Sequence, residues 1–379
     1  MNNEIEVSVV LPCLNEEDTI GICVRKAKEI FSRDGIRGEI IVCDNGSVDR
    51  SREIAAQEGA RVVSEAQKGY GAAYLRGLKE VNGKYIIIAD SDNTYDLYEI
   101  PKFLKALRDG FDFVMGSRFK GKIHGRAMPW ANRYLGNPVL SGMTRLFFKT
   151  RLSDIHCGMR AFTRDAYNKM ELKSLGMEFA TEMVVAALRN NFKITEIPVD
   201  YYPRQGESKL KPIPDAWRHI RFMLIYSPGW LYFIPGALGF TLGMLAMILL
   251  LPGPFFFLGR SWDLHVLIFS SVLTILSYQI LNLGVFARAF GISQGFLKSG
   301  PFMSFFQRRF SLEKGLLLGG ILFFLGSLIN IFILAEWFSR DFGALHRIRE
   351  SILAMTFLVI GLQTIFSSFF ISLLFLKRK

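Results

Sequence analysis

Two carboxylates that follow a short apolar run could bind one divalent cation. Asp90 and Asp92 come directly after residues 85–89, where three successive isoleucines are typical of a buried strand. Side chains at positions i and i+2 of an extended chain point to the same side, so both carboxylates could reach the same ion. Oxygen ligands suit Mg²⁺ or Mn²⁺, which bridge phosphates in other enzymes. A diphosphate bound through a metal ion is the first hypothesis, and a solvated turn after a strand is the alternative.

The segments before this pair alternate between strand and helix patterns. Short β-rich runs at residues 6–11, 38–43 and 61–64 each precede a segment with a helical pattern, and residues 85–89 form the fourth strand. Successive alternations of this kind predict an α/β domain with a parallel sheet and right-handed crossovers. Ligands of such sheets bind at the carboxyl ends of the strands, which is where Asp90 and Asp92 are expected.

Polar residues and glycines after the other predicted strands could bind a nucleotide. Asn15, Glu16 and Asp44 carry groups that could hydrogen-bond to a base and a ribose. Gly69 and Gly71 open a predicted helix, where backbone N–H groups could approach phosphate. The third glycine of a dinucleotide-binding fingerprint is absent, and the chain has no Walker A sequence. The sequence therefore predicts a nucleotide site of another kind.

The second half of the chain is far more apolar than the first. Of the 379 residues, 50% are hydrophobic and 34 are Phe. Four apolar stretches lie near residues 228–251, 264–290, 315–337 and 352–376, and each has about the twenty residues that a helix needs to cross a bilayer. We therefore expect a soluble domain at residues 1–211, a juxtamembrane amphipathic helix at 212–227, and a four-helix transmembrane domain at 228–379 with an amphipathic cytoplasmic loop at about 291–314.

The charges beside the apolar stretches predict the orientation in the membrane. Residues 1–6 lack the basic and apolar parts of a signal peptide, so the soluble domain is expected to stay in the cytosol. Ten Lys and Arg residues fall on the predicted inner side, against four on the outer side, namely Arg260, Arg340, Arg347 and Arg349. The positive-inside rule then predicts a multi-pass protein of the cell membrane, inner or plasma, with both termini and the soluble domain cytoplasmic.

The net charge indicates which partners the protein binds, and the cysteine content indicates the compartment. The net charge of +12 fits attraction to anionic lipids and phosphate groups better than binding of nucleic acid, given the membrane anchor. The four cysteines show no metal-ligand spacing, and we interpret them as buried thiols in a reducing compartment.

Seven short motifs resemble, in order and spacing, those of a known enzyme family. Four of them are Pro12-x-x-Asn15-Glu16, Asp44-x-Gly46-Ser47, Lys68-Gly69-x-Gly71-Ala72-Ala73 and Asp90-x-Asp92. Together they resemble the GT-A glycosyltransferases of family 2, which bind a nucleotide sugar. Three more are Gly116-Ser117-Arg118, Asp154-x-x-Cys157-Gly158-x-Arg160 and Arg204-x-Gly206-x-Ser208-Lys209. With the apolar stretches that follow, they narrow the resemblance to polyprenyl-phosphate hexose synthases of the dolichol-phosphate mannose and glucose synthase type.

The resemblance implies a GT-A, Rossmann-like, mostly parallel sheet flanked by helices, and a donor site on it. Asn15, Glu16 and Asp44 would hold the base and ribose, while Asp90 and Asp92 would bind the ribose, the diphosphate and a Mg²⁺ or Mn²⁺ ion. The other residues assigned to the nucleotide sugar are Pro12, Gly69, Arg204 and Lys209, and the last two would neutralise the diphosphate leaving group.

Two positions of the chain depart from the family pattern. Asn45 stands where members often carry a second Asp, and Thr94 stands where many carry Gln as a further metal ligand. Because Thr94 can offer only a neutral hydroxyl, metal affinity or metal choice could differ, and Thr94 is left out of the metal set.

The resemblance also implies an acceptor site. Arg118 and Arg133 would grip a lipid phosphate, because guanidinium groups match phosphate oxygens bidentately, and Asn137 is assigned to the same site. Apart from the family match, Arg118 could equally be a surface arginine. The catalytic assignments are Asp92, Arg118 and Asp154, of which Asp154 could orient the acceptor or take a proton. A phosphate monoester with a second pKa of about 6 is already largely ionised at neutral pH, so the reaction would barely need a base.

These features predict an inverting membrane glycosyltransferase, with the inversion itself implied by the resemblance. A hexose, with glucose and mannose as first candidates, would pass from a UDP- or GDP-sugar to undecaprenyl or dolichyl phosphate at the cytoplasmic membrane face. Transfer to another membrane lipid such as diacylglycerol, or a non-catalytic nucleotide-binding scaffold, are the alternatives. A homo-oligomer could form through Gly239-x-x-x-Gly243 and Gly315-x-x-x-Gly319, although packing within one helix bundle explains these glycines equally well.

Overall fold

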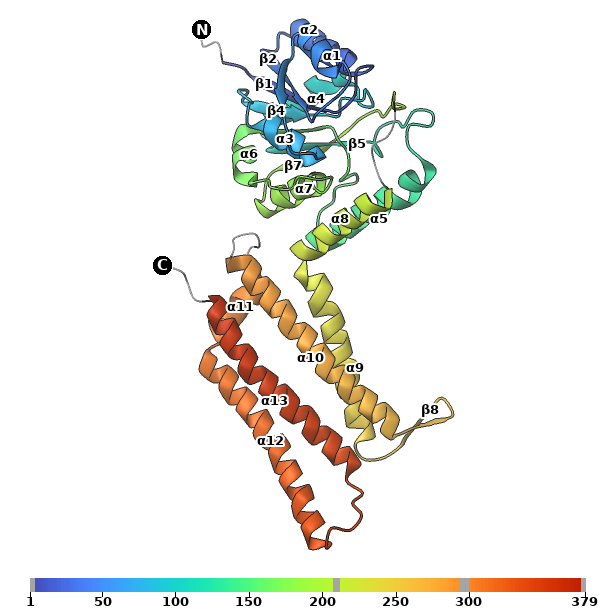
Figure 1. Ribbon diagram of the computed structural model, residues 1–379, viewed down its shortest axis with the longest axis vertical. Helices are drawn as coiled ribbons and strands as arrows, with labels where there is room; N and C mark the ends of the chain where they lie inside the picture. Colours follow the sequence, from blue (N-terminus) through green and yellow to red (C-terminus); the bar gives the residue numbers. More distant parts are fainter. Residues whose placement is uncertain (1–3, 207–211, 294–296, 298–299, 376–379) are drawn as a thin grey trace. The chain divides into compact units, whose positions relative to one another are not determined.

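A computed structural model describes residues 4–206, 212–293, 297 and 300–375 of the chain (Figure 1). The chain divides into an N-terminal unit, Met1–Met223, and a C-terminal unit, Leu224–Lys379. The N-terminal unit is built on a large sheet, and the C-terminal unit is built from long helices.

A seven-stranded sheet in the order β3-β2-β1-β4-β6-β5-β7 forms the centre of the N-terminal unit. The strands are β1 (Val7–Cys13), β2 (Gly38–Asp44), β3 (Arg61–Ser64), β4 (Tyr85–Ile88), β5 (Phe113–Ser117), β6 (Arg160–Thr163) and β7 (Ile194–Pro198). Every pairing is parallel except those of β6, which runs antiparallel to β4 and β5. The predicted α/β fold with a mostly parallel, GT-A-like sheet is confirmed.

Alternating strand residues build two cores, one on each face of the sheet. Val9 belongs to the core under α1 (Ile20–Arg33), α2 (Ser51–Gln57) and α4 (Ile100–Arg108), whereas its neighbour Val10 belongs to the opposite core. That second core lies under α3 (Tyr70–Leu78), α6 (Arg164–Met170) and α7 (Phe179–Arg189). Because helices cover both faces, the strands are apolar on both sides, and polar residues gather where strands end.

Two further helices of the N-terminal unit carry exposed apolar side chains. They are α5 (Asn137–Phe148), which follows the one-turn helix η2 (Asn132–Gly136), and α8 (Pro212–Tyr226). Thr144 of α5 and Met223 of α8 are in contact, with the hydroxyl 2.9 Å from the sulfur. The exposed large side chains here are Trp130, Tyr134, Leu135, Val139, Leu146, Ile213, Trp217 and Ile225. Exposed aromatic and aliphatic side chains of this kind suit a membrane interface.

The C-terminal unit contains four helices that are long and apolar enough to cross a membrane. They are Gly229–Leu250 (η3, Gly229–Phe233, continued by α9, Ile234–Leu250), α10 (Leu264–Ser293), α12 (Leu312–Ser339) and α13 (Ile348–Phe375). The short helix α11 (Pro301–Arg309) precedes α12, and a hairpin of β8 (Phe255–Phe257) and β9 (Arg260–Trp262) joins α9 to α10. The prediction of an α/β domain followed by four membrane helices is confirmed.

Glycines allow the membrane helices to approach each other closely. A Cβ atom at Gly239 of α9 would lie 2.2 Å from the Ser277 hydroxyl of α10, and one at Gly319 of α12 would lie 2.8 Å from the Gly361 carbonyl oxygen of α13. Hydroxyl pairs Ser271–Thr356 (2.7 Å) and Tyr278–Thr364 (2.5 Å) join α10 to α13. The glycine motifs are therefore used inside a single bundle, and a homo-oligomer remains a prediction.

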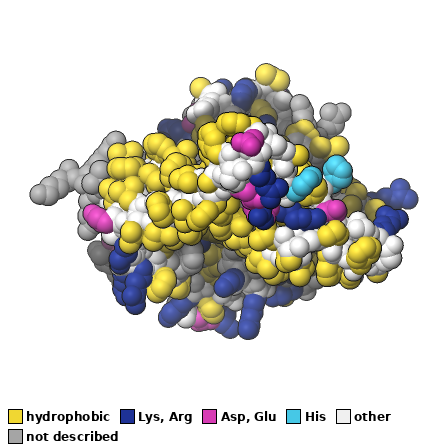
Figure 2. All heavy atoms as spheres, turned by 90° about the horizontal axis from the view of Figure 1, so that it is seen from below, with side chains coloured by type: hydrophobic (Ala, Val, Ile, Leu, Met, Phe, Trp, Pro, Cys, Tyr) yellow, Lys and Arg dark blue, Asp and Glu magenta, His cyan; other side chains and the backbone are white. Residues whose placement is uncertain are grey.

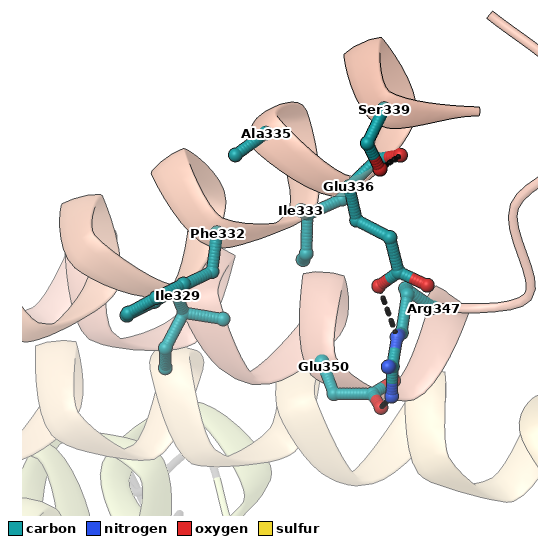
Figure 3. Close-up of a pocket in the computed structure, with 8 residues that line it drawn as sticks. All are labelled: Ile329, Phe332, Ile333, Ala335, Glu336, Ser339, Arg347 and Glu350. Carbon is teal, nitrogen blue, oxygen red and sulfur yellow. Dashed lines mark hydrogen bonds and ion pairs between the residues drawn. The ribbon is translucent and has the colours of Figure 1, made fainter. Parts of the chain in front are cut away.

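A cavity of about 550 Å³ lies between α12 and α13, close to their connection. It is lined by Ile329, Phe332, Ile333, Ala335, Glu336, Ser339, Arg347 and Glu350 (Figure 3). Arg347 lies 2.8 Å from Glu336 and 2.9 Å from Glu350, so it fastens the two helix ends. Figure 2 shows charged and histidine side chains grouped within a largely hydrophobic face at this end of the helices. None of the predicted site residues lines the cavity.

Candidate active site

Asp90 lies in the segment after β4 and is held by hydroxyl groups from α3. Its Oδ1 accepts hydrogen bonds from the Tyr70 hydroxyl at 2.9 Å and from the Tyr74 hydroxyl at 3.4 Å. Burial raises the pKa of Asp90 to about 6, and the nearby negative charge of Asp92 adds to the shift. A cation bound between Asp90 and Asp92 would reduce the repulsion between their negative charges.

Asp92 is almost fully buried and its two oxygens have different partners. Oδ1 accepts from the backbone N–H of Thr94 at 3.1 Å and from the Thr94 hydroxyl at 2.6 Å. Oδ2 accepts from the Nη1 of Arg204 at 2.9 Å. Thr94, which departs from the family pattern, therefore orients the carboxylate of Asp92.

Arg204, from the segment after β7, joins two strand ends. Besides Asp92, its guanidinium bonds Glu16, with the Nη2 nitrogen 2.5 Å from Oε1. Its Nε–H is buried and has no hydrogen-bond partner among the described residues. Arg204 thus meets residues 112 and 188 positions away in the sequence, Asp92 and Glu16, near the ends of β4 and β1.

The loops after β1 and β2 are tied together by the residues predicted to hold the base and ribose. Asn15 accepts from the backbone N–H of Val48 at 2.9 Å, and the backbone N–H of Asn15 donates to the Ser47 hydroxyl at 2.9 Å. The carboxylate of Asp44 accepts from the backbone N–H groups of Gly46 at 3.1 Å and Ser47 at 3.0 Å. These side chains therefore shape the loops in which they lie.

The carbonyl oxygen of Pro12 links β1 to the carboxylate segment. It accepts a hydrogen bond of 2.5 Å from the Ser91 hydroxyl, between Asp90 and Asp92. Pro12 thus lies beside the predicted metal ligands and holds their segment against the end of β1.

Asn45 performs a task that the expected Asp could not. Its amide nitrogen donates to the carbonyl oxygens of Glu65 at 3.1 Å and Gln67 at 2.7 Å, and its oxygen accepts from the backbone N–H of Gly69 at 2.8 Å. A carboxylate has no N–H to donate and would face two carbonyl oxygens. The amide at this position fixes the segment that leads into α3.

Gly69, just before α3, and Gly71, in its first turn, both lie against a neighbouring segment. A Cβ atom at Gly69 would lie 2.2 Å from the carbonyl oxygen of Leu175, and one at Gly71 would lie 2.2 Å from that of Ser174. The backbone N–H of Gly69 is bonded to Asn45, and that of Ala72 donates to Leu175 at 3.1 Å. The glycines let the start of α3 pack against the segment before α7. The N–H of Gly69 is thus engaged by Asn45, and an approach of the Gly71 N–H to phosphate stays a prediction.

Arg118 and Asp154 form a buried, bidentate ion pair. The Nε of Arg118 lies 2.7 Å from one carboxylate oxygen of Asp154, its Nη2 lies 2.8 Å from the other, and the Arg118 backbone N–H also donates to Asp154 at 3.1 Å. The guanidinium lies 5.2 Å from the centre of the Tyr201 ring. The structure brings these two predicted catalytic residues together, and their direct contact with an acceptor remains a prediction.

The other predicted acceptor residues lie in the segment with exposed aromatic side chains. Arg133 of η2 lies 5.4 Å from the centre of the Tyr134 ring, and the amide of Asn137 lies 3.5 Å from the sulfur of Met128. Among the hydrogen bonds of the described residues, none joins Arg133 or Asn137 to Arg118. Lys209 lies outside the described residues. A shared site for these residues stays a prediction.

Sequence reasoning missed two residues that hold the site. Arg160 is fully buried and donates to the carbonyl oxygens of Ile155 at 2.7 Å, Cys157 at 2.9 Å and Ala180 at 2.5 Å, so it fixes the segment that carries Asp154. Tyr70 orients Asp90 through its hydroxyl. Both residues lie inside motifs already noted, Arg160 as a named position and Tyr70 as the unnamed one between two glycines.

The donor chemistry of Asp90 and Asp92 fits a hard divalent cation. Both residues offer carboxylate oxygens, which such ions prefer as ligands. Asp92 is already bonded to one positive group, the guanidinium of Arg204. Among the described residues, no three His, Cys, Asp or Glu side chains converge as a metal-binding group. Asp90 and Asp92 are therefore the residues that would hold such an ion.

Comparisons with known proteins agree on one family. The family model described as Glycosyl transferase family 2 matches residues 8–170, and the one described as Glycosyltransferase family 2 C-terminal transmembrane region matches residues 285–375. The Low-salt glycan biosynthesis hexosyltransferase Agl6 of Haloferax volcanii is 39% identical over 366 residues, which cover 96% of this chain and 87% of that protein. The Dolichyl-phosphate hexose transferase of the same organism is 34% identical over 209 residues, covering 55% of this chain and 87% of that protein.

A more distant likeness is found among solved structures. A crystal structure of glucosyl-3-phosphoglycerate synthase from Mycobacterium tuberculosis is 22% identical, with a TM-score of 0.47 over 58% of this chain and 79% of that one. At that similarity it bears on neither substrate nor cofactor. The 39% identity over nearly the whole chain decides the relationship. The chain belongs to glycosyltransferase family 2, and it is a glycosyltransferase with a C-terminal transmembrane region.

Proposed function

We propose that the protein transfers a hexose, with inversion, from a UDP- or GDP-sugar to a polyprenyl phosphate at the cytoplasmic face of the cell membrane. The observation that carries the proposal is the group of Asp90, Asp92 and Arg204 at the carboxyl ends of the strands, in a chain with four candidate membrane helices. The relative named Dolichyl-phosphate hexose transferase supports both the sugar class and the lipid acceptor.

The donor side would use charges of both signs. Asp90 and Asp92 would hold Mg²⁺ or Mn²⁺, which supplies positive charge to the diphosphate as the sugar leaves. Tyr70 keeps Asp90 oriented, and Thr94 does the same for Asp92. Arg204 would add a second positive charge beside the diphosphate, and Lys209 would add a third. The nucleoside diphosphate departs when the bond between its β-phosphate oxygen and the anomeric carbon breaks.

The acceptor side would use Arg118 as a fixed phosphate ligand. Asp154 engages the Nε and Nη2 of Arg118, which leaves the Nη1 nitrogen for a phosphate oxygen. Because the buried ion pair is neutral overall, further positive charge would have to come from Arg133, and Asn137 would add a neutral donor. Exposed Trp130 and Tyr134 beside Arg133 would place this segment at the headgroup level.

The pairing of Asp154 favours an acceptor that is already ionised. A phosphate monoester carries its negative charge at neutral pH and can attack the anomeric carbon without losing a proton. A neutral hydroxyl, such as that of diacylglycerol, would need a base to accept its proton. Both oxygens of Asp154 already accept hydrogen bonds from Arg118, so the carboxylate is engaged within the ion pair. The diacylglycerol alternative is therefore the weaker one.

The proposal is tested by donor selection with purified full-length protein. Radiolabelled UDP- and GDP-hexoses are offered one at a time with Mn²⁺ or Mg²⁺ and undecaprenyl or dolichyl phosphate in detergent. We expect one donor to give an organic-extractable product from which mild acid releases the hexose. Nucleotide binding without transfer from any donor would instead support the non-catalytic scaffold.

A further inference from the structure

Arg204 occupies a position in which it competes with a metal ion. We infer that Arg204 is an exchangeable counter-ion: it neutralises Asp92 until metal and nucleotide arrive, then passes to the diphosphate, so that metal and nucleotide bind cooperatively. This inference rests on the proposed metal-dependent nucleotide-sugar site, and it assigns that site a binding order.

The competition follows from the way the oxygens of Asp92 are used. Oδ1 already accepts two hydrogen bonds from Thr94, at 3.1 and 2.6 Å. Oδ2 is the oxygen with remaining capacity, and Arg204 holds it at 2.9 Å. A metal ion that binds Asp92 therefore has to displace the Nη1 of Arg204 or share Oδ2 with it. Two positive groups on one oxygen repel each other, so displacement is the favoured outcome.

Burial makes the ion pair strong enough to matter. Asp92 is 7% exposed and Glu16 is 9% exposed, while 24% of the Arg204 side chain is exposed. Charges at such positions are poorly screened, and a buried carboxylate that loses a cationic partner is strongly destabilised. A metal ion that binds without nucleotide must offset the lost ion pair between Asp92 and Arg204. It has few carboxylates with which to do so, because no three acidic, His or Cys side chains converge among the described residues.

The diphosphate gives Arg204 a new partner. Glu16 can keep hold of Nη2, at 2.5 Å, while Nη1 turns from Asp92 to a phosphate oxygen. The buried Nε–H, which has no partner among the described residues, points to the Nη2 side of the guanidinium and does not form a fork with Nη1. The new contact to the diphosphate is therefore a single charge-assisted hydrogen bond from Nη1. When the nucleotide binds, it draws Arg204 away from Asp92, so Arg204 no longer competes with the metal ion. When the metal ion binds Asp92, it releases Arg204, which can then bind the diphosphate of the nucleotide.

The test measures Mn²⁺ binding by electron paramagnetic resonance, without turnover. Purified full-length protein is titrated with Mn²⁺ alone and then with UDP or GDP present, for the native chain, Arg204→Gln and Arg204→Lys. We expect Arg204→Gln to bind Mn²⁺ alone about tenfold more tightly than the native chain, and the gain in Mn²⁺ affinity caused by the nucleotide to shrink by a similar factor. Arg204→Lys, which keeps the charge but cannot bridge two carboxylates, should lie between the two.

The control is Arg108→Gln, which removes the same charge from an exposed arginine paired with Glu6. It should leave both affinities unchanged. Native protein that binds Mn²⁺ with nucleotide, together with Arg204→Gln that binds Mn²⁺ alone no more tightly, would overturn the counter-ion inference and spare the proposed function. Absence of Mn²⁺ binding to the native chain under every condition would overturn both. Thermal unfolding of each variant shows that it is folded.

Discussion

Among single residues, the carboxylate of Asp92 has the most partners at the site. Thr94 and Arg204 bond it, and we propose that it also binds a metal ion. We expect Asp92→Ala to lower the transfer rate by at least about 100-fold, because it removes a charge that positions both the cation and the guanidinium. Initial rates in detergent measure the effect, with the exposed Asp109→Ala as the matched control. Full activity in Asp92→Ala, with normal membrane insertion, would remove the metal assignment.

The raised pKa of Asp90 predicts a pH dependence of metal binding. Burial, with a contribution from Asp92, raises this pKa to about 6. Below that pH the carboxyl group is protonated, so a metal ion must displace a proton, and affinity is lost as the pH falls. We expect Mn²⁺ affinity to drop about tenfold for each pH unit below about 6 and to level off above about 7.

The measurement uses a nucleotide sugar without acceptor, because its diphosphate has no terminal phosphate that titrates in this range. Mn²⁺ affinity that is the same at pH 5 and pH 7.5 would show that Asp90 is not a ligand.

The sequence predicts which residues gather at the site better than it predicts what each one bonds. β4 ends at Ile88, so Asp90 and Asp92 lie beyond the strand, and the period of two along a strand does not by itself place their carboxylates together. No local pattern could reveal the bridge from Arg204 to Glu16, because its ends lie 188 positions apart. Glycines at a predicted helix start suggested an approach to phosphate, and nothing in the sequence indicated that Gly69 also lies against Leu175. A sequence motif indicates which residues belong to the site, whereas their bonding partners are seen only in the tertiary structure.

At the scale of elements, the start of α3 depends on the absence of a side chain. A methyl group at Gly71 would lie 2.2 Å from the carbonyl oxygen of Ser174 and 2.9 Å from the Cβ of Phe179, so helix and loop would have to separate. We expect Gly71→Ala to destabilise the N-terminal unit by about 1–3 kcal/mol. The unfolding temperature should fall by about 2–4 °C for each kcal/mol.

Gly142→Ala is the matched control, because the added Cβ in α5 would meet only the end of the Arg145 side chain at 3.8 Å. Thermal unfolding followed by intrinsic fluorescence compares the two variants. Equal unfolding temperatures would mean that α3 does not rest on the segment before α7 as described.

Strands and membrane helices differ in how far the sequence predicts them. Four apolar stretches that are each long enough to cross a bilayer predict membrane-spanning helices, and all four are helices in the structure. The first four strands follow from their alternation with helices. The antiparallel insertion of β6 between β4 and β5 does not, because strand order is set by pairing across distant segments. The apolar residues Ile213 and Trp217 of α8 are exposed, which agrees with the expected interfacial helix.

At the scale of the whole molecule, the charge distribution predicts orientation. The N-terminal unit should lie on the cytoplasmic side and the β8–β9 hairpin on the opposite side. All four native cysteines are buried, so a single introduced cysteine can be labelled selectively. In intact cells we expect a membrane-impermeant maleimide to label Phe256→Cys in the hairpin and to label Val48→Cys only after permeabilisation. Both positions are exposed, at 76% and 92%. The reverse pattern would contradict the proposed orientation.

The most direct test of the central claim is a choice between acceptors. Purified protein in vesicles that contain equal amounts of polyprenyl phosphate and diacylglycerol is given the labelled nucleotide hexose and Mn²⁺. We predict that the label enters the lipid fraction, that mild acid releases it as free hexose, and that a chelator prevents its transfer. An acid-stable glycolipid, or transfer that continues with the metal removed, would contradict the account.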